Sequence, residues 1–302
     1  MTPFLEQIPI VDAHHHLWRL AGDNYPKFVG PPKDFFLGDY SALYADFLPA
    51  DYREVSRAHN VVATVHIEAE WRREDQVGES AWVDSVASEH RLPDALVGHA
   101  WFDSPEIEQV LEAHAEYPRM RGIRSKPALP GYPPSGDEQG RGDMDDPVWR
   151  RGYALLSRFG MSWDLRVPHV QLPQAASVLE AFPDIPAVLN HTGFPWDRSQ
   201  DGLAAWRGDM QTVARCPQLF VKLSELGLRD KAWDYEENRR IILETIDMFG
   251  VERCMFASNF PVAGLRIDFD SLYTAYKNMV SEFSEAEQLA LFHDNASRFY
   301  RL

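Results

Sequence analysis

The feature that most constrains the fold is a regular alternation of short apolar runs with longer stretches of helical periodicity. The apolar runs have the length and composition of buried strands and occupy residues 8–13, 61–68, 96–102, 120–126, 161–167, 186–191, 219–224 and 254–259. The stretches around them predict helices at 51–59, 75–91, 104–117, 146–159, 171–182, 200–215, 237–249 and 284–299. Eight such units indicate a parallel sheet closed into a barrel. We therefore predict an α/β protein, a (β/α)8 TIM barrel that spans residues 1–302 as a single domain. An open doubly wound sheet is the alternative, but no glycine-rich phosphate turn follows the first strand.

Two connections are longer than ordinary barrel loops, namely 19–50 after the first strand and 127–145 after the fourth. The first is rich in aromatic residues: Tyr25, Phe28, Phe35, Phe36 and Tyr40. The second is rich in proline and glycine: Pro127, Pro130, Gly131, Pro133, Pro134 and Gly136. Both should emerge at the C-terminal face, where barrel enzymes keep their active sites. We expect them to act as lids there, the alternative being insertions without a function.

The overall charge limits the class of partner. The chain has 46 acidic and 30 basic residues and a formal net charge of −16. Such a field repels phosphate backbones and anionic lipids, so we expect neither a nucleic acid nor a membrane as a partner. The two cysteines, Cys216 and Cys254, have no metal-type spacing and fit a reducing compartment. The N-terminus lacks the pattern of a signal peptide, and no apolar stretch approaches the roughly 20 residues that span a bilayer. We therefore predict a cytoplasmic protein, whose oligomeric state the sequence leaves open, a homo-oligomer included.

Three consecutive histidines follow the apolar part of the first strand. Side chains on a strand alternate between its two faces, so His14 and His16 should point the same way and His15 the opposite way. Two imidazoles on one face at the C-terminal end of a barrel strand can share a divalent ion or hold one substrate group. The alternative is a pair of buried, hydrogen-bonded histidines. We expect His15 to pack against the helical layer.

Other predicted strands also place polar residues near their C-terminal ends. His191 ends the sixth strand. The second strand has Thr64, His66 and Glu68 on one face, with Val65 and Ile67 on the other. Arg124 and Lys126 share a face of the fourth strand, and Asp164 and Arg166 share a face of the fifth. Polar groups inside a barrel are costly to bury without partners, and their convergence from five strands predicts a site.

Several segments together resemble the amidohydrolase-related family that includes sugar-lactone and pyrone-dicarboxylate lactonases. These segments are VDAHHHLW, LNHTGFP, VKLSELG, MFASNFPV and DNASRFYRL, in this order from about residue 8 to the C-terminus. The resemblance implies a TIM barrel, a first-strand pair of His14 and His16, and His191 as the histidine of the sixth strand. The segment RGIR resembles one whose arginine, here Arg124, contacts anionic substrates in these lactonases.

The last strand departs from the family pattern. Relatives commonly read Ser-Asp-Trp-Pro there, with the aspartate binding the metal or activating water, whereas this chain has Asn259. An amide can orient a water molecule but cannot take its proton at neutral pH, and it is a poorer zinc ligand than a carboxylate. Glu68 is the first candidate for a replacement base and His191 the second. Glu68 is equally well explained as an ion-pair partner of Arg124 or Lys126.

We therefore predict hydrolysis of a lactone or a related carboxyl ester of a small acid, with a carboxylate-bearing lactone as the substrate. His14, His16 and His191 would hold a divalent metal, with zinc the expected ion, or polarise the carbonyl directly in a metal-free site. The catalytic candidates are His191, Asn259 and Glu68. Candidate substrate contacts, polar and aromatic, are His66, Arg124, Lys126, Arg166, Trp18, Tyr25 and Trp71. A metal-dependent decarboxylase of the same superfamily and a non-catalytic binding barrel are the alternatives.

Overall fold

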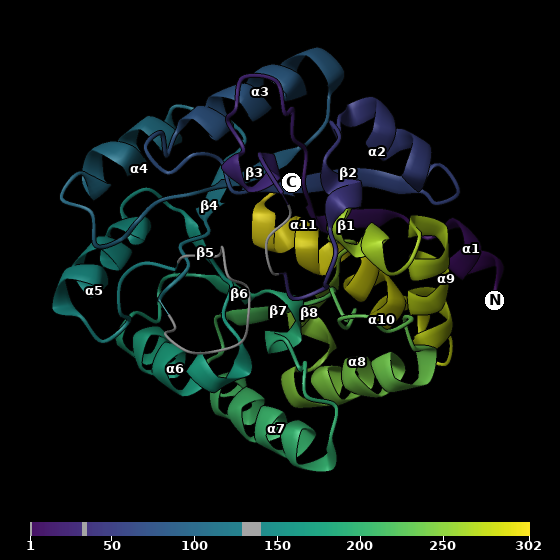
Figure 1. Ribbon diagram of the computed structural model, residues 1–302. Coiled ribbons are helices and arrows are strands. Elements are labelled where there is room, and N and C mark those ends of the chain that lie inside the picture. Colours follow the sequence, from purple (N-terminus) through teal and green to yellow (C-terminus); the bar gives the residue numbers. More distant parts are fainter. Residues whose placement is uncertain (1, 32–34, 129–139) are drawn as a thin grey trace.

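The fold is a parallel barrel built in chain order, as a computed structural model covering residues 2–31, 35–128 and 140–302 shows. Within these residues eight parallel strands form one sheet, and each strand pairs with the next. The strands are β1 (Ile10–His15), β2 (Val61–Ile67), β3 (Ala95–Gly98), β4 (Met120–Ile123), β5 (Ser162–Leu165), β6 (Ala187–Leu189), β7 (Leu219–Leu223) and β8 (Cys254–Phe256). Each lies within or close to a predicted run, and helices surround the sheet (Figure 1). The predicted TIM barrel is confirmed.

The first and last strands meet just beyond the regular end of β8. The backbone N–H of Asn259 donates to the His14 carbonyl at 2.7 Å, and that of His16 donates to the Phe260 carbonyl at 2.8 Å. Asp12 strengthens this contact, because its carboxylate accepts hydrogen bonds from the N–H and hydroxyl of Ser258 at 2.8 and 2.6 Å. The barrel is thus nearly closed, and its closure holds the histidine strand beside Asn259.

The helices form the outer layer (Figure 1). In the described part of the chain they are α1 (Pro3–Gln7), α2 (Pro49–Ser56), α3 (Gly78–His90), α4 (Ile107–Ala115), α5 (Pro147–Ala154), α6 (Leu172–Ala181), α7 (Gln200–Ala214), α8 (Tyr235–Phe249), α9 (Phe269–Met279), α10 (Glu285–Leu289) and α11 (Asn295–Tyr300). The helix expected at 284–299 is divided into α10 and α11 by a π-helical turn, Ala290–Asp294. The sequence patterns did not predict α1 and α9. None of these helices is long and apolar enough to cross a membrane.

Two apolar layers lie on the two sides of the sheet. The larger one fills the space between strands and helices. The smaller one combines residues of β1, β2, β3, β6 and β8, which can meet only inside the barrel, and includes Val65 and Ile67. It also contains Phe299 and Tyr300 of α11. Because the Tyr300 carbonyl accepts from Arg121 in β4 at 2.7 Å, α11 lies near the strands and helps to fill the barrel interior.

The long connection after β1 is packed by its own aromatic side chains. A third apolar cluster joins residues of this connection to the ends of the first two strands: Trp18, Tyr25, Phe28, Phe35, Phe36, Leu37, Tyr40, Leu43, Ala69 and Trp71. Residues 19–31 and 35–50 therefore cover the barrel mouth with a packed layer. Of the proline- and glycine-rich loop after β4, Pro130, Gly131, Pro133, Pro134 and Gly136 lie outside the described residues.

Candidate active site

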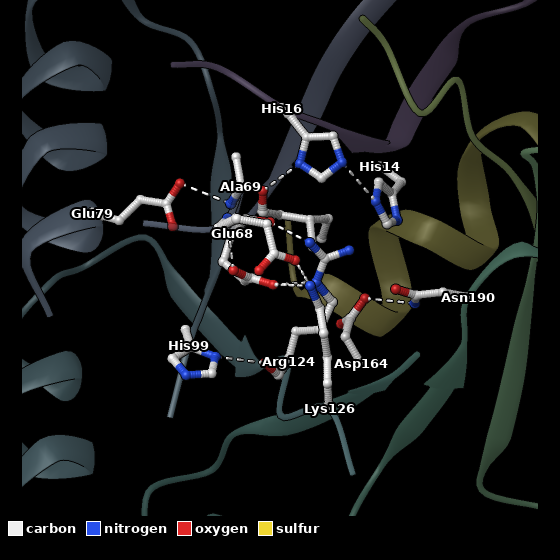
Figure 2. Close-up of polar contacts among 12 residues, drawn as sticks. His14, His16, Glu68, Ala69, Glu79, His99, Arg124, Lys126, Asp164 and Asn190 are labelled. Carbon is white, nitrogen blue, oxygen red and sulfur yellow. Dashed lines mark hydrogen bonds and ion pairs between the residues drawn. The ribbon is translucent and has the colours of Figure 1, made fainter. Parts of the chain in front are cut away.

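The first strand turns His14 and His16 toward each other. Their Nε2 atoms are 3.3 Å apart, and Nδ1 of His16 lies 2.7 Å from the carbonyl oxygen of Ile67 (Figure 2). A carbonyl can only accept, so His16 carries a proton on Nδ1 and keeps its Nε2 directed at His14. His15 points away, and its ring packs against Tyr52 of α2 with a centroid distance of 4.5 Å. This is the alternation that the sequence predicts.

A fully buried ion pair lies beside His14. The Lys222 ammonium on β7 is 2.5 Å from the Asp164 carboxylate on β5 and 3.3 Å from Nδ1 of His14. Asp164 also accepts from the Asn190 amide at 3.1 Å (Figure 2). The Tyr300 hydroxyl donates to the same carboxylate, at 3.1 and 3.2 Å. Burial lowers the pKa of Lys222 to about 8, so it is mostly protonated at neutral pH. A protonated lysine only donates, and its contact therefore places the proton of neutral His14 on Nε2.

His191 follows β6 in a backbone conformation that is rare for residues with a side chain. Its φ is +59°, and the next residue, Thr192, has a φ of +51°. Positive φ values at non-glycine residues are uncommon and gather at functional sites. The ring of His191 lies 4.6 Å from that of His14, centroid to centroid, and its Nδ1 is 2.9 Å from the Ser224 hydroxyl. The turn thus directs His191 toward the histidine pair.

Asn259 stands between the histidine pair and a buried acid. Its Oδ1 is 3.1 Å from Nε2 of His16, and its Nδ2 donates to the Glu225 carboxylate. Asn259 and Glu225 both have a left-handed backbone, with φ values of +54° and +46°. Burial raises the pKa of Glu225 to about 7, although the hydrogen bond from Asn259 lowers it in part. The amide therefore connects a carboxyl group to the catalytic candidates.

Glu68 lies in a cluster of ion pairs at the ends of β2 and β4. The Nε of Arg124 donates to it at 2.8 Å, and the Lys126 ammonium lies 3.3 Å from its carboxylate (Figure 2). The Arg73 guanidinium lies 3.1 Å from the same carboxylate. Glu70 pairs with Arg73 and Lys126. Burial raises the pKa of Glu68, but Lys126, Arg124 and Arg73 outweigh burial and hold it well below its usual range. A carboxylate held in this way accepts a proton poorly at neutral pH.

The three site histidines are neutral. Burial lowers the pKa of each well below its usual range, and neighbouring cations lower it further. The cation that lowers the pKa most is Lys222 for His14, Arg124 for His16 and Arg166 for His191. Neutral imidazoles keep a lone pair at physiological pH, so the site can accept a proton or bind an electrophile.

A pocket with about 470 Å³ of empty volume opens beside these groups. Its polar lining includes His16, His191, Asn259, Arg124 and Arg166. The opposite wall is largely aromatic and comes from the connection after β1: Trp18, Phe28, Phe35, Phe36 and Leu43. The pocket therefore joins a polar floor to an apolar wall.

Six predicted site residues lie outside this lining: His14, Tyr25, His66, Glu68, Trp71 and Lys126. The ring of His66 faces Glu79 of α3 at 3.5 Å and accepts from the Leu17 N–H, so it points toward the helical layer instead of the barrel interior. The expected contact between His66 and the substrate stays a prediction. Tyr25 donates to Glu79 at 3.1 Å and anchors the loop. Glu68 and Lys126 belong to the ion-pair cluster beside the pocket.

The sequence patterns did not single out Lys222 or Glu225. Lys222 alternates with Val221 and Leu223 in an apolar run, where one lysine can equally be an edge residue. A single charged residue within an otherwise apolar strand is the sequence signal that could have identified Lys222. Glu225 directly follows the same strand, a position typical of barrel catalytic residues, and this signal was available.

The comparisons agree with this geometry. The family model described as Amidohydrolase matches residues 11–302. An uncharacterized protein of Sinorhizobium fredii is 35% identical, and the alignment covers 99% of this chain and all of the relative. The L-fucono-1,5-lactonase of Burkholderia multivorans is 28% identical over 97% of this chain and 96% of its own length.

A solved structure points the same way. An amidohydrolase from Burkholderia multivorans with bound zinc has a TM-score of 0.81 and 25% identity to this chain, and the match covers 97% of this chain and 99% of the other. The resemblance therefore extends over the barrel and its strand ends together.

Proposed function

The chain belongs to the amidohydrolase family and is a hydrolase, and from this premise we propose that it opens a lactone that carries a carboxylate. The observation that supports the substrate class is the composition of the pocket. Two guanidinium groups, Arg124 and Arg166, share one cavity with His16, His191 and an amide. A similarity to a lactonase supports the reaction, because that relative acts on a cyclic ester.

The two arginines are suited to holding an anion. Arg124 is anchored at Nε and Nη2 by the carboxylate and the carbonyl of Glu68, and it still lines the pocket. Arg166 lies over the ring of Phe194, 5.1 Å from its centroid. Guanidinium groups bind carboxylates through charge-assisted hydrogen bonds, and a pre-oriented guanidinium loses little entropy on binding. We assign Glu68 to the orientation of Arg124 and not to proton transfer.

The polar floor then carries the reaction. A water molecule that donates one hydrogen bond to Asn259 Oδ1 would be oriented for attack on the lactone carbonyl, and neutral His191 would take the proton on its other O–H. The C–O bond of the ring breaks, and His191 returns this proton to the leaving oxygen. Negative charge that forms on the carbonyl oxygen raises the basicity of His191 as the reaction proceeds. The product is a single hydroxy acid, because the leaving oxygen stays attached to the opened chain.

The donor set fits a resident zinc ion poorly. The separation of the His14 and His16 Nε2 atoms, 3.3 Å, suits two ligands of one tetrahedral ion with bonds of about 2.0–2.1 Å. However, Lys222 places the proton of His14 on that same Nε2, and Asn259 offers an amide in place of a carboxylate. Among the described residues, no three His, Cys, Asp or Glu side chains form a group that could hold a metal. The predicted zinc ion thus stays a prediction, which metal analysis of protein purified without chelator would test.

The proposal is tested with a lactone panel that varies the two features of the pocket. Five- and six-membered lactones with a carboxylate, their methyl esters, and polyhydroxylated lactones such as L-fucono-1,5-lactone are assayed by proton release. We expect the carboxylate-bearing lactones to have the highest kcat/KM. Arg124→Met should raise KM for them at least tenfold and leave the methyl esters nearly unchanged. Equal losses for acid and ester would refute the assignment of Arg124, and hydrolysis of no lactone would refute the proposed reaction. Release of carbon dioxide without ring opening would identify a decarboxylase, and binding without turnover a binding barrel.

A further inference from the structure

Glu225 is a buried acid that the proposed chemistry does not use. It follows β7, is 4% exposed, and has a left-handed backbone with a φ of +46°. A glutamate rarely adopts this conformation, because its Cβ then approaches the backbone closely. The turn is also tightly filled, because a side chain at Gly227 would place its Cβ 3.0 Å from Oε1 of Glu225. A strained, buried carboxyl group at a strand end calls for a functional explanation.

The partner of Glu225 is the amide of Asn259. Nδ2 of Asn259 donates to Oε2 of Glu225, while Oδ1 of the same amide faces His16 at 3.1 Å. Asn259 lines the pocket, and its backbone is held by the hydrogen bond to the His14 carbonyl. With the backbone held, rotation about χ1 and χ2 remains, and χ2 sets the direction of the amide. An amide presents a donor on one side and an acceptor on the other, so its direction decides what the pocket receives.

We propose that Glu225 is a positioning residue that fixes the direction of the Asn259 amide, with the nitrogen toward Glu225 and the oxygen toward the pocket. Neutral His16 carries its proton on Nδ1, so its Nε2 does not donate to this oxygen, and the contact with Glu225 is what holds the amide. The inference rests on the proposed function, because the amide oxygen matters there as the group that orients water. The pair works as one unit, an acceptor at 225 facing a donor at 259. Exchanging the two polarities together should therefore preserve the pair, while changing only one should break it.

Four variants test this relation. Glu225→Gln keeps an acceptor oxygen, whereas Glu225→Met has a similar volume and keeps none. Asn259→Asp places a second carboxylate against that of Glu225. The double variant, Asn259→Asp with Glu225→Gln, again pairs one donor with one acceptor, now with the donor at 225 and the acceptor at 259. The assay is run at about pH 8, above the pKa that burial gives Glu225, so that its carboxylate is present.

We expect Glu225→Gln to keep kcat within about fivefold, and Glu225→Met and Asn259→Asp each to lower kcat about a hundredfold with little change in KM. The double variant should be at least tenfold more active than Asn259→Asp alone. A purely structural acid would give additive losses in the double variant, and that result would overturn the proposal. Wild-type kcat in Glu225→Met, or a gain of activity with bound metal in Asn259→Asp, would also overturn it.

The melting temperatures of the same proteins provide a readout that needs no substrate. Asn259→Asp should melt lower than the wild type, and adding Glu225→Gln should recover at least half of the difference, because residues in contact are not additive. If the wild type hydrolyses no lactone on the panel, the proposed function fails while this coupling still tests the pair. Additive melting temperatures would refute the pairing even in an active lactonase.

Discussion

Replacing Lys222 with methionine should destabilise the protein strongly. Methionine keeps most of the volume but removes the ammonium that lies 2.5 Å from Asp164 and 3.3 Å from His14. Both members of the ion pair are completely buried, so the substitution leaves a carboxylate with only the neutral donors Tyr300 and Asn190. Breaking a buried ion pair by removing one partner costs about 3–5 kcal/mol.

This cost converts to a measurable shift. With about 2.1 cal/mol/K of unfolding entropy per residue, a chain of 302 residues has roughly 0.6 kcal/mol/K, so Tm should fall by about 5–8 °C. Thermal unfolding followed by circular dichroism measures it. Arg57→Met is the matched control, because Arg57 pairs with Glu54 at 2.6 Å on the surface and such pairs contribute about 0–1 kcal/mol.

A second variant separates lost charge pairing from lost packing. In Lys222→Met with Asp164→Asn the site has no charge, and the amide oxygen can still accept from Tyr300. We expect this protein to recover at least half of the lost stability. A single variant within about 1 °C of the wild type would refute the argument that this ion pair supports the barrel. A double variant as unstable as the single one would show that packing, not charge, is lost.

Three further predictions follow from the site. His16→Ala should abolish turnover with the fold intact, since losing a group in the reaction centre costs several kcal/mol of transition-state stabilisation. His15→Ala should instead lower Tm and leave kcat nearly unchanged. Activity of His16→Ala within about threefold of the wild type would contradict the assignment of His16 to the site. The pKa of Glu225 is raised from 4.5 to about 7, so its contribution to the free energy of unfolding is complete below about pH 4 and is lost as the pH rises through about 7. In urea titrations at several pH values across this range, the wild type should lose this contribution and Glu225→Gln should not. The same pH dependence in both proteins would contradict the argument. Phe36→Ala should raise KM for lactones with an apolar ring and spare polyhydroxylated ones, because Phe36 belongs to the aromatic wall; an equal effect on both would place the substrate elsewhere.

The sequence pattern predicts the strands better than the direction of their side chains. On β2 the alternation of Thr64, Val65, His66, Ile67 and Glu68 separates two faces, but both faces of a barrel strand are buried and polarity does not say which one is interior. Val65 and Ile67 in fact fill the interior, and His66 meets α3. On β1, by contrast, the close approach of His14 and His16 follows directly from their spacing.

The helix α9 shows a different limit. Asp268 caps it by accepting from the Ser271 N–H, and Phe269, Leu272 and Tyr276 recur at helical spacing on its buried face. These signals were present in the sequence. However, the β/α repeat predicts one helix after the eighth strand, and the pattern at 284–299 already accounted for that helix. An extra helix in that last connection breaks the repeat, and only its own periodicity identifies it.

The overall charge and the local charge of this protein have opposite signs, and the local one governs the proposed chemistry. The chain carries a net charge of −16, yet Arg124, Arg166 and Lys222 lie at or beside the pocket. Exposed charges are screened beyond about 8 Å at physiological ionic strength, whereas buried groups interact through a medium of low dielectric constant. An anionic substrate therefore experiences the cations of the pocket and little of the distant acidic surface. Because Glu68 and Asp164 hold two of these cations in place, an anion that enters meets charges already in position.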